Sequence, residues 1–374
     1  MSAPPIGNTG GKAKRQPGIE VLRMLAMYLI VLGHYLYNYV KTGDALSTFD
    51  VAQPAQAISY ALTETMIVFT STGVDLFVLI TGFFLVSRPV FRIKGMLSVA
   101  LTTIFYAVGV FVLFCLTGRH GFLLKELLLN LSPIPVHQYW FVAKYLGLML
   151  VAPFLSLLAL QLSKKGYQLL LLVLFVLFFE WTFGELFGGG MSLNWFCFLF
   201  LVGGYLSRHG IPSWLSAHTG WGIVAVAAAI FALHTATNLL AWLKTGAPFV
   251  LKYDGNHSFT FFLALFIFVL FVRHPLQGRT VGGLARLAPY TFGVYLLHEH
   301  YLLKDVLWQH IAPAFLPTLP LFLHGILLSL LIFCAALFID SLRAFLFRVL
   351  HIPALLETLS RRINARIPPL ETRT

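Results

Sequence analysis

The sequence has 374 residues, of which 58% are hydrophobic and 11% charged, and its formal net charge is +12. This composition excludes a soluble globular domain, which needs a polar, water-facing surface. The basic residues are spread over short loops rather than gathered into one patch, which argues against nucleic acid as a partner. The sequence instead predicts an integral membrane protein whose solvent is the lipid bilayer.

Ten apolar segments follow one another along the chain, each close to the roughly 20 residues that a helix needs to cross the bilayer. They cover residues 20–40, 62–86, 95–117, 139–162, 167–187, 192–207, 219–243, 257–272, 288–308 and 320–340. Their Leu, Phe and Val runs lack the two-residue alternation of a membrane barrel. We therefore predict an all-α fold, a polytopic bundle of about ten transmembrane helices.

Lys and Arg residues set the expected orientation, because cytoplasmic loops carry more of them than outer loops do. Threading the segments alternately from a cytoplasmic start places most cations inside: Arg88, Arg92, Lys94, Lys164, Lys165, Arg208, Arg273, Arg279, Arg286, Arg343, Arg348, Arg361 and Arg362. The outer set is Lys41, Arg119, Lys125, Lys244, Lys252 and Lys304. The pattern predicts a cell-membrane protein with cytoplasmic tails at 1–19 and 346–374 and a transmembrane domain at 20–345.

The three cysteines, Cys115, Cys197 and Cys334, all lie inside apolar segments. A thiol in such a position behaves as a small hydrophobic group, and the spacing of the three matches no metal site. We expect neither a disulfide nor a bound metal.

A few ionisable residues inside the apolar segments need an explanation, because burying such a group in lipid is costly. Arg23 and His34 are eleven residues apart, which is three helical turns, so they share one helix face about 16 Å apart. Asp75 in the second segment and His298 and Glu299 in the ninth come to the same depth as His34, about 15 Å from the inner surface. Convergence at the bilayer midplane favours a functional cavity over isolated packing residues.

Each of these residues also has a structural alternative. A lone intramembrane histidine is often a packing residue, Asp75 could bond a neighbouring helix, and Glu299 could simply pair with His298. The cations after the second segment, Arg88, Arg92 and Lys94, could be ordinary topology determinants.

Five segments, taken in chain order, are similar to those of the membrane-bound acyltransferase-3 family. Gly18-Ile-Glu-Val-Leu-Arg23, followed by ten residues and His34, resembles the opening helix of that family. The others are Ser71 to Leu85 with its Thr81-Gly-Phe element, Tyr139-Trp-Phe to Pro153, Phe200-Leu-Val-Gly-Gly-Tyr205 and Pro289-Tyr-Thr-Phe-Gly-Val-Tyr-Leu-Leu-His298. One departure is Arg88-Pro-Val-Phe-Arg92-Ile-Lys94, where many members have Arg-x-x-Arg.

The resemblance implies transfer of an acyl group, usually acetyl, from cytoplasmic acyl-coenzyme A to a hydroxyl of an extracytoplasmic sugar or lipid. The compact form of the chain and its Gly73-Val-Asp-Leu-Phe77 variant look most like the branch found in bacterial exopolysaccharide and surface-glycan clusters. His34 would act as general base or as nucleophile, and Glu299 or Asp75 would orient it. The phosphates of coenzyme A would bind the cations Arg23, Arg88, Arg92 and Lys94.

A transporter or flippase for a polysaccharide precursor is the alternative, since midplane polar residues also mark substrate paths. The alignment of Arg23 with His34 above a basic inner rim favours the enzyme, because an acyl-donor site uses these groups and a flippase need not.

Overall fold

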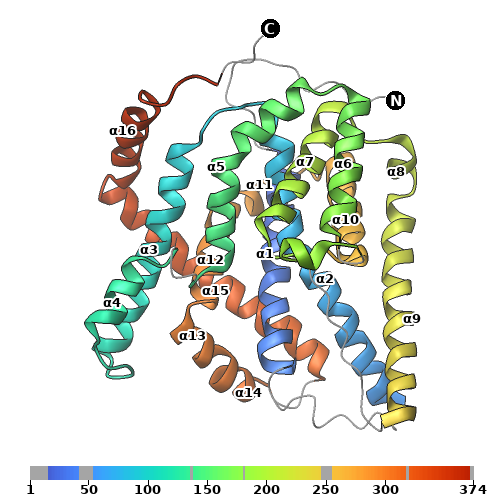
Figure 1. The fold of residues 1–374 in the computed structure, drawn as a ribbon. Coiled ribbons are helices and arrows are strands. Elements are labelled where there is room, and N and C mark those ends of the chain that lie inside the picture. Colours follow the sequence, from blue (N-terminus) through green and yellow to red (C-terminus); the bar gives the residue numbers. More distant parts are fainter. Residues whose placement is uncertain are drawn as a thin grey trace.

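The computed structural model describes residues 16–41, 54–134, 138–179, 182–245, 255–316 and 320–370. Most of the predicted first tail, and Lys252 among the predicted outer cations, lie outside these residues. The described part contains helices and no strand, packed side by side as a bundle (Figure 1). The all-α prediction is confirmed for these residues.

Within the described residues, six helices are long and apolar enough to cross a membrane. They are α1 (Pro17–Tyr35) with its π-helical extension η1 (Leu36–Lys41), α2 (Pro54–Leu85), α3 (Ile93–Leu116), α5 (Trp140–Gln161), α9 (Thr219–Thr245) and α15 (Leu321–Val349). Such helices make the chain compatible with a multi-pass membrane protein.

The count of about ten spans is not confirmed, because the remaining apolar segments form shorter or broken helices. Three of them are α6 (Lys164–Phe178), α7 (Leu193–His209) and α10 (Ser258–Arg273). The predicted ninth span, 288–308, is divided into η4 (Ala288–Tyr290), α12 (Thr291–His298), α13 (Tyr301–Asp305) and η5 (Val306–Ile311). The other elements are α4 (Leu124–Leu131), η3 (Gly184–Phe187), α8 (Ser213–Ala217), α11 (Arg279–Ala285), α14 (Ala312–Ala314) and α16 (Ile352–Asn364).

The centre of the bundle is the contact between α2 and the almost entirely buried α7. Glycines allow the two backbones to touch: a Cβ on Gly82 would lie 2.0 Å from the Phe200 carbonyl oxygen, and one on Gly203 would lie 2.2 Å from that of Leu79. Small residues at helix crossings are typical of membrane bundles, where close packing replaces the hydrophobic effect. Two of the family-like segments, those around Gly82 and Gly203, therefore have a packing role.

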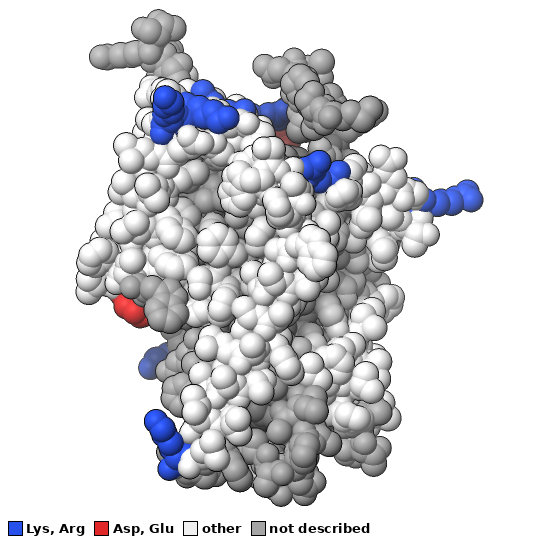
Figure 2. Space-filling view, turned by 90° about the vertical axis from the view of Figure 1, so that its right-hand side faces the viewer, with Lys and Arg blue, Asp and Glu red and all other residues white. Residues whose placement is uncertain are grey.

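The bundle has two distinct ends. α16 and the link between α2 and α3 lie at the upper end in Figure 1. On the face seen in Figure 2, most Lys and Arg side chains lie toward this upper end, and the wide band below is almost free of charge. Residues 352–364 of the predicted second tail form α16, which packs on α3 and is joined to it by a 2.7 Å ion pair between Lys94 and Glu357.

Candidate active site

His34 is presented by a local change in helix type at the end of α1. The helix begins with Pro17 at its first position, where a proline costs no hydrogen bond. Directly after Tyr35 the chain continues as the π-helix η1, and Asn38 donates a hydrogen bond of 2.8 Å to the His34 carbonyl. π-Helical turns often occur at functional sites, because they change the direction of neighbouring side chains.

His298 and Glu299 lie where the predicted ninth span breaks. α12 ends at His298, Glu299 is its C-cap, and His300 is the N-cap of α13. The His300 ring caps α13 and joins the break to α3: Nδ1 accepts from the Leu302 amide, and Nε2 donates to the Ala107 carbonyl at 3.2 Å. A helix can be interrupted at membrane depth only if its backbone is satisfied or lines a cavity.

The two elements bring three polar side chains together. His34 Nδ1 lies 2.8 Å from His298 Nε2 and 3.2 Å from Glu299 Oε1. Lys304 Nζ approaches the same Glu299 oxygen at 3.5 Å. His298 is fully enclosed, whereas the side chains of His34 and Glu299 retain 22% and 11% of their exposure. The cluster is therefore buried on one side and open on the other.

The hydrogen bonds assign the protons in this cluster. His298 Nδ1 lies 2.6 Å from the Val294 carbonyl oxygen, which can only accept, so Nδ1 carries the hydrogen. In a neutral ring Nε2 of His298 is then an acceptor, and His34 Nδ1 must be the donor. It follows that His34 Nε2 bears a lone pair, and no described residue engages it. This is the nitrogen that could take a proton or attack a carbonyl.

Asp75 does not join the cluster. Its Oδ1 accepts a 3.1 Å hydrogen bond from the Trp195 indole, and Oδ2 has no partner among the described residues. A Cβ on Gly73 would lie 2.6 Å from the Ala26 carbonyl oxygen, so that position faces α1. Asp75 is two residues further on and so points about 200° away, toward α7. Asp75 thus bonds a neighbouring helix, α7, and its predicted convergence with His34 is not observed.

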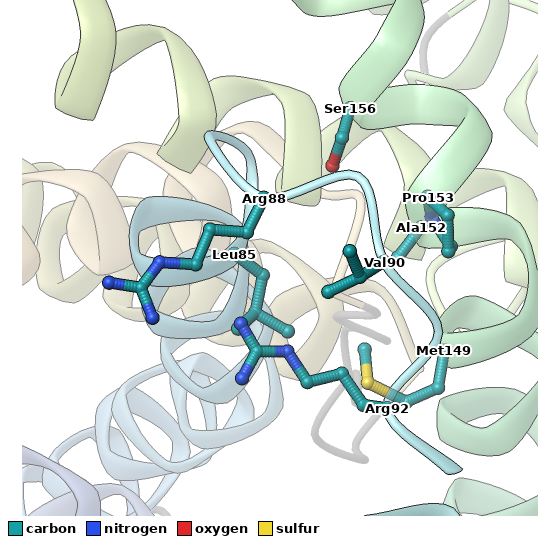
Figure 3. Close-up of a pocket in the computed structure, with 8 residues that line it drawn as sticks. All are labelled: Leu85, Arg88, Val90, Arg92, Met149, Ala152, Pro153 and Ser156. Atoms are coloured by element: carbon teal, nitrogen blue, oxygen red, sulfur yellow. The ribbon is translucent and has the colours of Figure 1, made fainter. Parts of the chain in front are cut away.

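The predicted donor-binding cations are divided among three places. Arg88 and Arg92 line a small pocket with Met149 and Pro153 of α5, and their guanidinium groups extend to the same side of the loop (Figure 3). Arg92 Nε has no partner among the described residues. Arg23, by contrast, pairs with Glu20 at 3.3 Å, and Lys94 pairs with Glu357.

One face of α5 connects the pocket with the histidine cluster. Phe141, Tyr145 and Met149 are four residues apart, so they form a single stripe about 12 Å long. Met149 lies in the arginine pocket, and Phe141 stacks on Tyr145 and packs against Tyr295, whose ring lies edge-on to His298.

Sequence reasoning missed the roles of His298 and Lys304 in this geometry. The sequence predicts His298 at the right depth but gives it no part in the chemistry, and it predicts Lys304 only as an outer cation. The available signal was the clustering of His298, Glu299 and Lys304 within seven residues, together with the family-like segment that ends at His298. The expectation of no metal came from cysteine spacing and did not consider these ligand-type groups.

Fold and site together define a multi-pass membrane protein with a histidine-centred polar site inside its helix bundle. The family model described as an acyltransferase domain matches residues 16–339. The chain therefore belongs to the acyltransferase-3 family of membrane proteins. No curated protein and no solved structure matches it.

Proposed function

We propose that this protein moves an acyl group, acetyl in the simplest case, from cytoplasmic acyl-coenzyme A to a hydroxyl of an extracytoplasmic sugar, lipid-linked sugar or surface polysaccharide. The upper end in Figure 1 is then the cytoplasmic one, in agreement with the positive-inside rule. The observation that carries the proposal is the His34 ring, whose Nδ1 is held by His298 while Nε2 keeps its lone pair.

Two routes use this lone pair. In the first, Nε2 takes the proton of the acceptor hydroxyl while its oxygen bonds to the thioester carbonyl carbon; the C–S bond breaks, and the proton passes to the thiolate. In the second, Nε2 attacks the carbonyl carbon itself, the thiolate leaves, and the acyl group then passes from the imidazole to the hydroxyl oxygen, whose proton goes to the thiolate. Both routes end with an acyl ester and the free thiol of coenzyme A.

Each route passes through a positively charged His34 ring. The Glu299 carboxylate, 3.2 Å from Nδ1, stabilises that charge, as the carboxylate of a catalytic triad does. His298 holds the ring in the tautomer that leaves Nε2 unprotonated. Lys304 supplies a countercharge that keeps Glu299 in place.

The donor is assigned to the Arg88 and Arg92 pocket. Arginines bind phosphates through several directed hydrogen bonds, and these two lie at the end of the bundle that the proposal makes cytoplasmic. The long arm of coenzyme A would follow the Phe141, Tyr145 and Met149 stripe toward His298. Arg23 and Lys94 are left as secondary contacts, because each is already paired with a glutamate.

The decisive variant is His34→Asn. The asparagine amide can replace Nδ1 as hydrogen-bond donor to His298 but has no counterpart of Nε2. We expect acyl transfer from labelled acetyl-coenzyme A to fall by about 10²–10⁴-fold, the usual contribution of a general base. Insertion and thermal stability should be unchanged, and the exposed His310→Asn is the matched control.

Near-normal acylation of the surface glycan by His34→Asn, measured by mass spectrometry, would contradict the proposal. Movement of a glycan precursor across reconstituted vesicles without consumption of acyl-coenzyme A would support the flippase instead.

A further inference from the structure

His34, His298 and Glu299 also form a set of metal-ligand types. Each offers one donor atom, and the three donor atoms all lie within 4.8 Å of one another. We propose that this triad binds a divalent transition-metal ion, with Zn²⁺ as the reference ion, and that the bound ion inhibits acyl transfer. The proposed metal binding depends on the geometry alone, whereas the proposed inhibition of acyl transfer rests on the proposed function.

Two of the three donor-atom distances are close to those of a zinc site. Tetrahedral zinc with bonds of about 2.0–2.1 Å separates its ligand atoms by about 3.3 Å. His34 Nδ1 and Glu299 Oε1 are already 3.2 Å apart, and the 2.8 Å between His34 Nδ1 and His298 Nε2 needs to open by only about half an ångström. Two histidines and a glutamate are a known ligand set for zinc with one open position.

The hydrogen bonding of His298 also favours metal binding. Histidine ligands usually donate their second ring nitrogen to a carbonyl or carboxylate, which fixes the lone pair toward the metal. The 2.6 Å hydrogen bond from His298 Nδ1 to the Val294 carbonyl does this, so Nε2 points its lone pair into the cluster. His34 and Glu299 are partly exposed, whereas the Glu299 Oε1 atom itself is buried, so an ion reaches the site past the exposed parts of these two side chains.

Lys304 competes with the metal ion for the Glu299 carboxylate. Its ammonium lies 3.5 Å from the Glu299 oxygen that the metal would take, and its side chain is one-third exposed and so can move aside. Two neutral histidines and one carboxylate leave a Zn²⁺ ion with an excess positive charge beside this lysine. The site should therefore bind reversibly rather than hold a permanent structural ion.

Inhibition follows from the His34 tautomer. A metal on Nδ1 needs the lone pair there, so the single ring hydrogen of neutral His34 moves from Nδ1 to Nε2, with no net gain or loss of protons. Nε2 then has no lone pair for the acceptor hydroxyl or the thioester. The ion blocks the reaction without reaching the donor pocket.

The binding test uses the purified full-length chain in detergent, stripped with a chelator and titrated with ZnCl₂ in a calorimeter. Glu299→Gln, which keeps the side-chain shape, and His298→Asn should each weaken binding at least tenfold. Lys304→Met should tighten it several-fold, a gain that misfolding cannot produce. The exposed His310→Gln is the control and should bind as the wild type does.

Binding that is unaffected by Glu299→Gln and His298→Asn, or no tightening in Lys304→Met, would overturn the site. The inhibition test then follows acyl transfer as Zn²⁺ is added and removed again with EDTA. Zn²⁺ binding without loss of acyl transfer would overturn only the proposed inhibition. Absence of acyl transfer in metal-free wild type would count against the proposed function, while the calorimetric result would still decide the metal site.

Discussion

Two of the polar clusters inside the described bundle are built in opposite ways. In the first, the fully buried Asp340 accepts a 2.8 Å hydrogen bond from Tyr106 of α3 and two from Arg343, also at 2.8 Å. In the second, His34 and Glu299 are partly exposed, and Glu299 Oε1 has no well-aligned hydrogen bond although His34 Nδ1 and the Lys304 ammonium lie within 3.5 Å of it. A satisfied cluster holds helices together, whereas an incomplete one is available for chemistry.

The largest effect is expected when the satisfied cluster is broken. Asp340→Ala leaves the Arg343 guanidinium buried without its anion, which costs about 3–5 kcal/mol of stability. The melting temperature in detergent should fall sharply, whereas His34→Asn should leave it unchanged. The double variant Asp340→Leu with Arg343→Met should recover most of the loss, because an apolar pair removes both buried charges. An Asp340→Ala protein as stable as the wild type would show that the satisfied cluster does not stabilise the bundle, contrary to the contrast between the two clusters.

A smaller change tests whether the two clusters are coupled. A Cβ on Gly293 of α12 would lie 2.1 Å from Asp340 Oδ1, so Gly293→Ala must push α12 away from α15 at a cost of about 1–3 kcal/mol. His298 is five residues further along α12, about 7.5 Å away, so acyl transfer should fall as well. Gly282→Ala, which has open space around its Cβ, is the control for both measurements. Identical behaviour of the two variants would mean that the clusters are independent.

The smallest effect is expected at the cations of the upper end, where a paired and an unpaired cation can be compared. Lys94 has Glu357 as its partner, whereas burial and the neighbouring Arg88 lower the pKa of Arg92, as expected of a cation without an anion. Arg92→Gln should raise the KM for acetyl-coenzyme A about tenfold, which corresponds to roughly 1.4 kcal/mol of lost donor binding. Lys94→Gln should leave KM unchanged. A raised KM in Lys94→Gln together with an unchanged KM in Arg92→Gln would instead indicate a donor site beside α16.

Hydropathy located the long helices because their composition alone excludes water. It could not show that residues 288–308 are broken, since the apolar run continues across the break and the interruption depends on hydrogen bonds such as that of His300 with Ala107. Counting residues along a helix located His34 and Glu299 at one depth, and they do meet. The same count failed for Asp75 because depth does not specify which neighbour a side chain faces.

The pairing of His34 with His298 joins residues 264 positions apart, which no local spacing can reveal. The sequence signals for a role of His298 are its place beside Glu299 and Lys304 and the family-like segment that it ends. The tautomer of His34, on which the proposed chemistry depends, required the Val294 carbonyl and is a property of the fold alone.

The most direct measurement of the central claim compares His298→Gln with His298→Asn in reconstituted acyl transfer at saturating acetyl-coenzyme A. Glutamine can place its amide oxygen near the position of Nε2 and still accept the hydrogen of His34 Nδ1, whereas asparagine is too short to reach. If His298 holds His34 in the reactive tautomer, His298→Gln will retain at least tenfold more activity than His298→Asn, with equal amounts of folded protein. Equal rates for the two variants, both close to that of the wild type, would contradict the account.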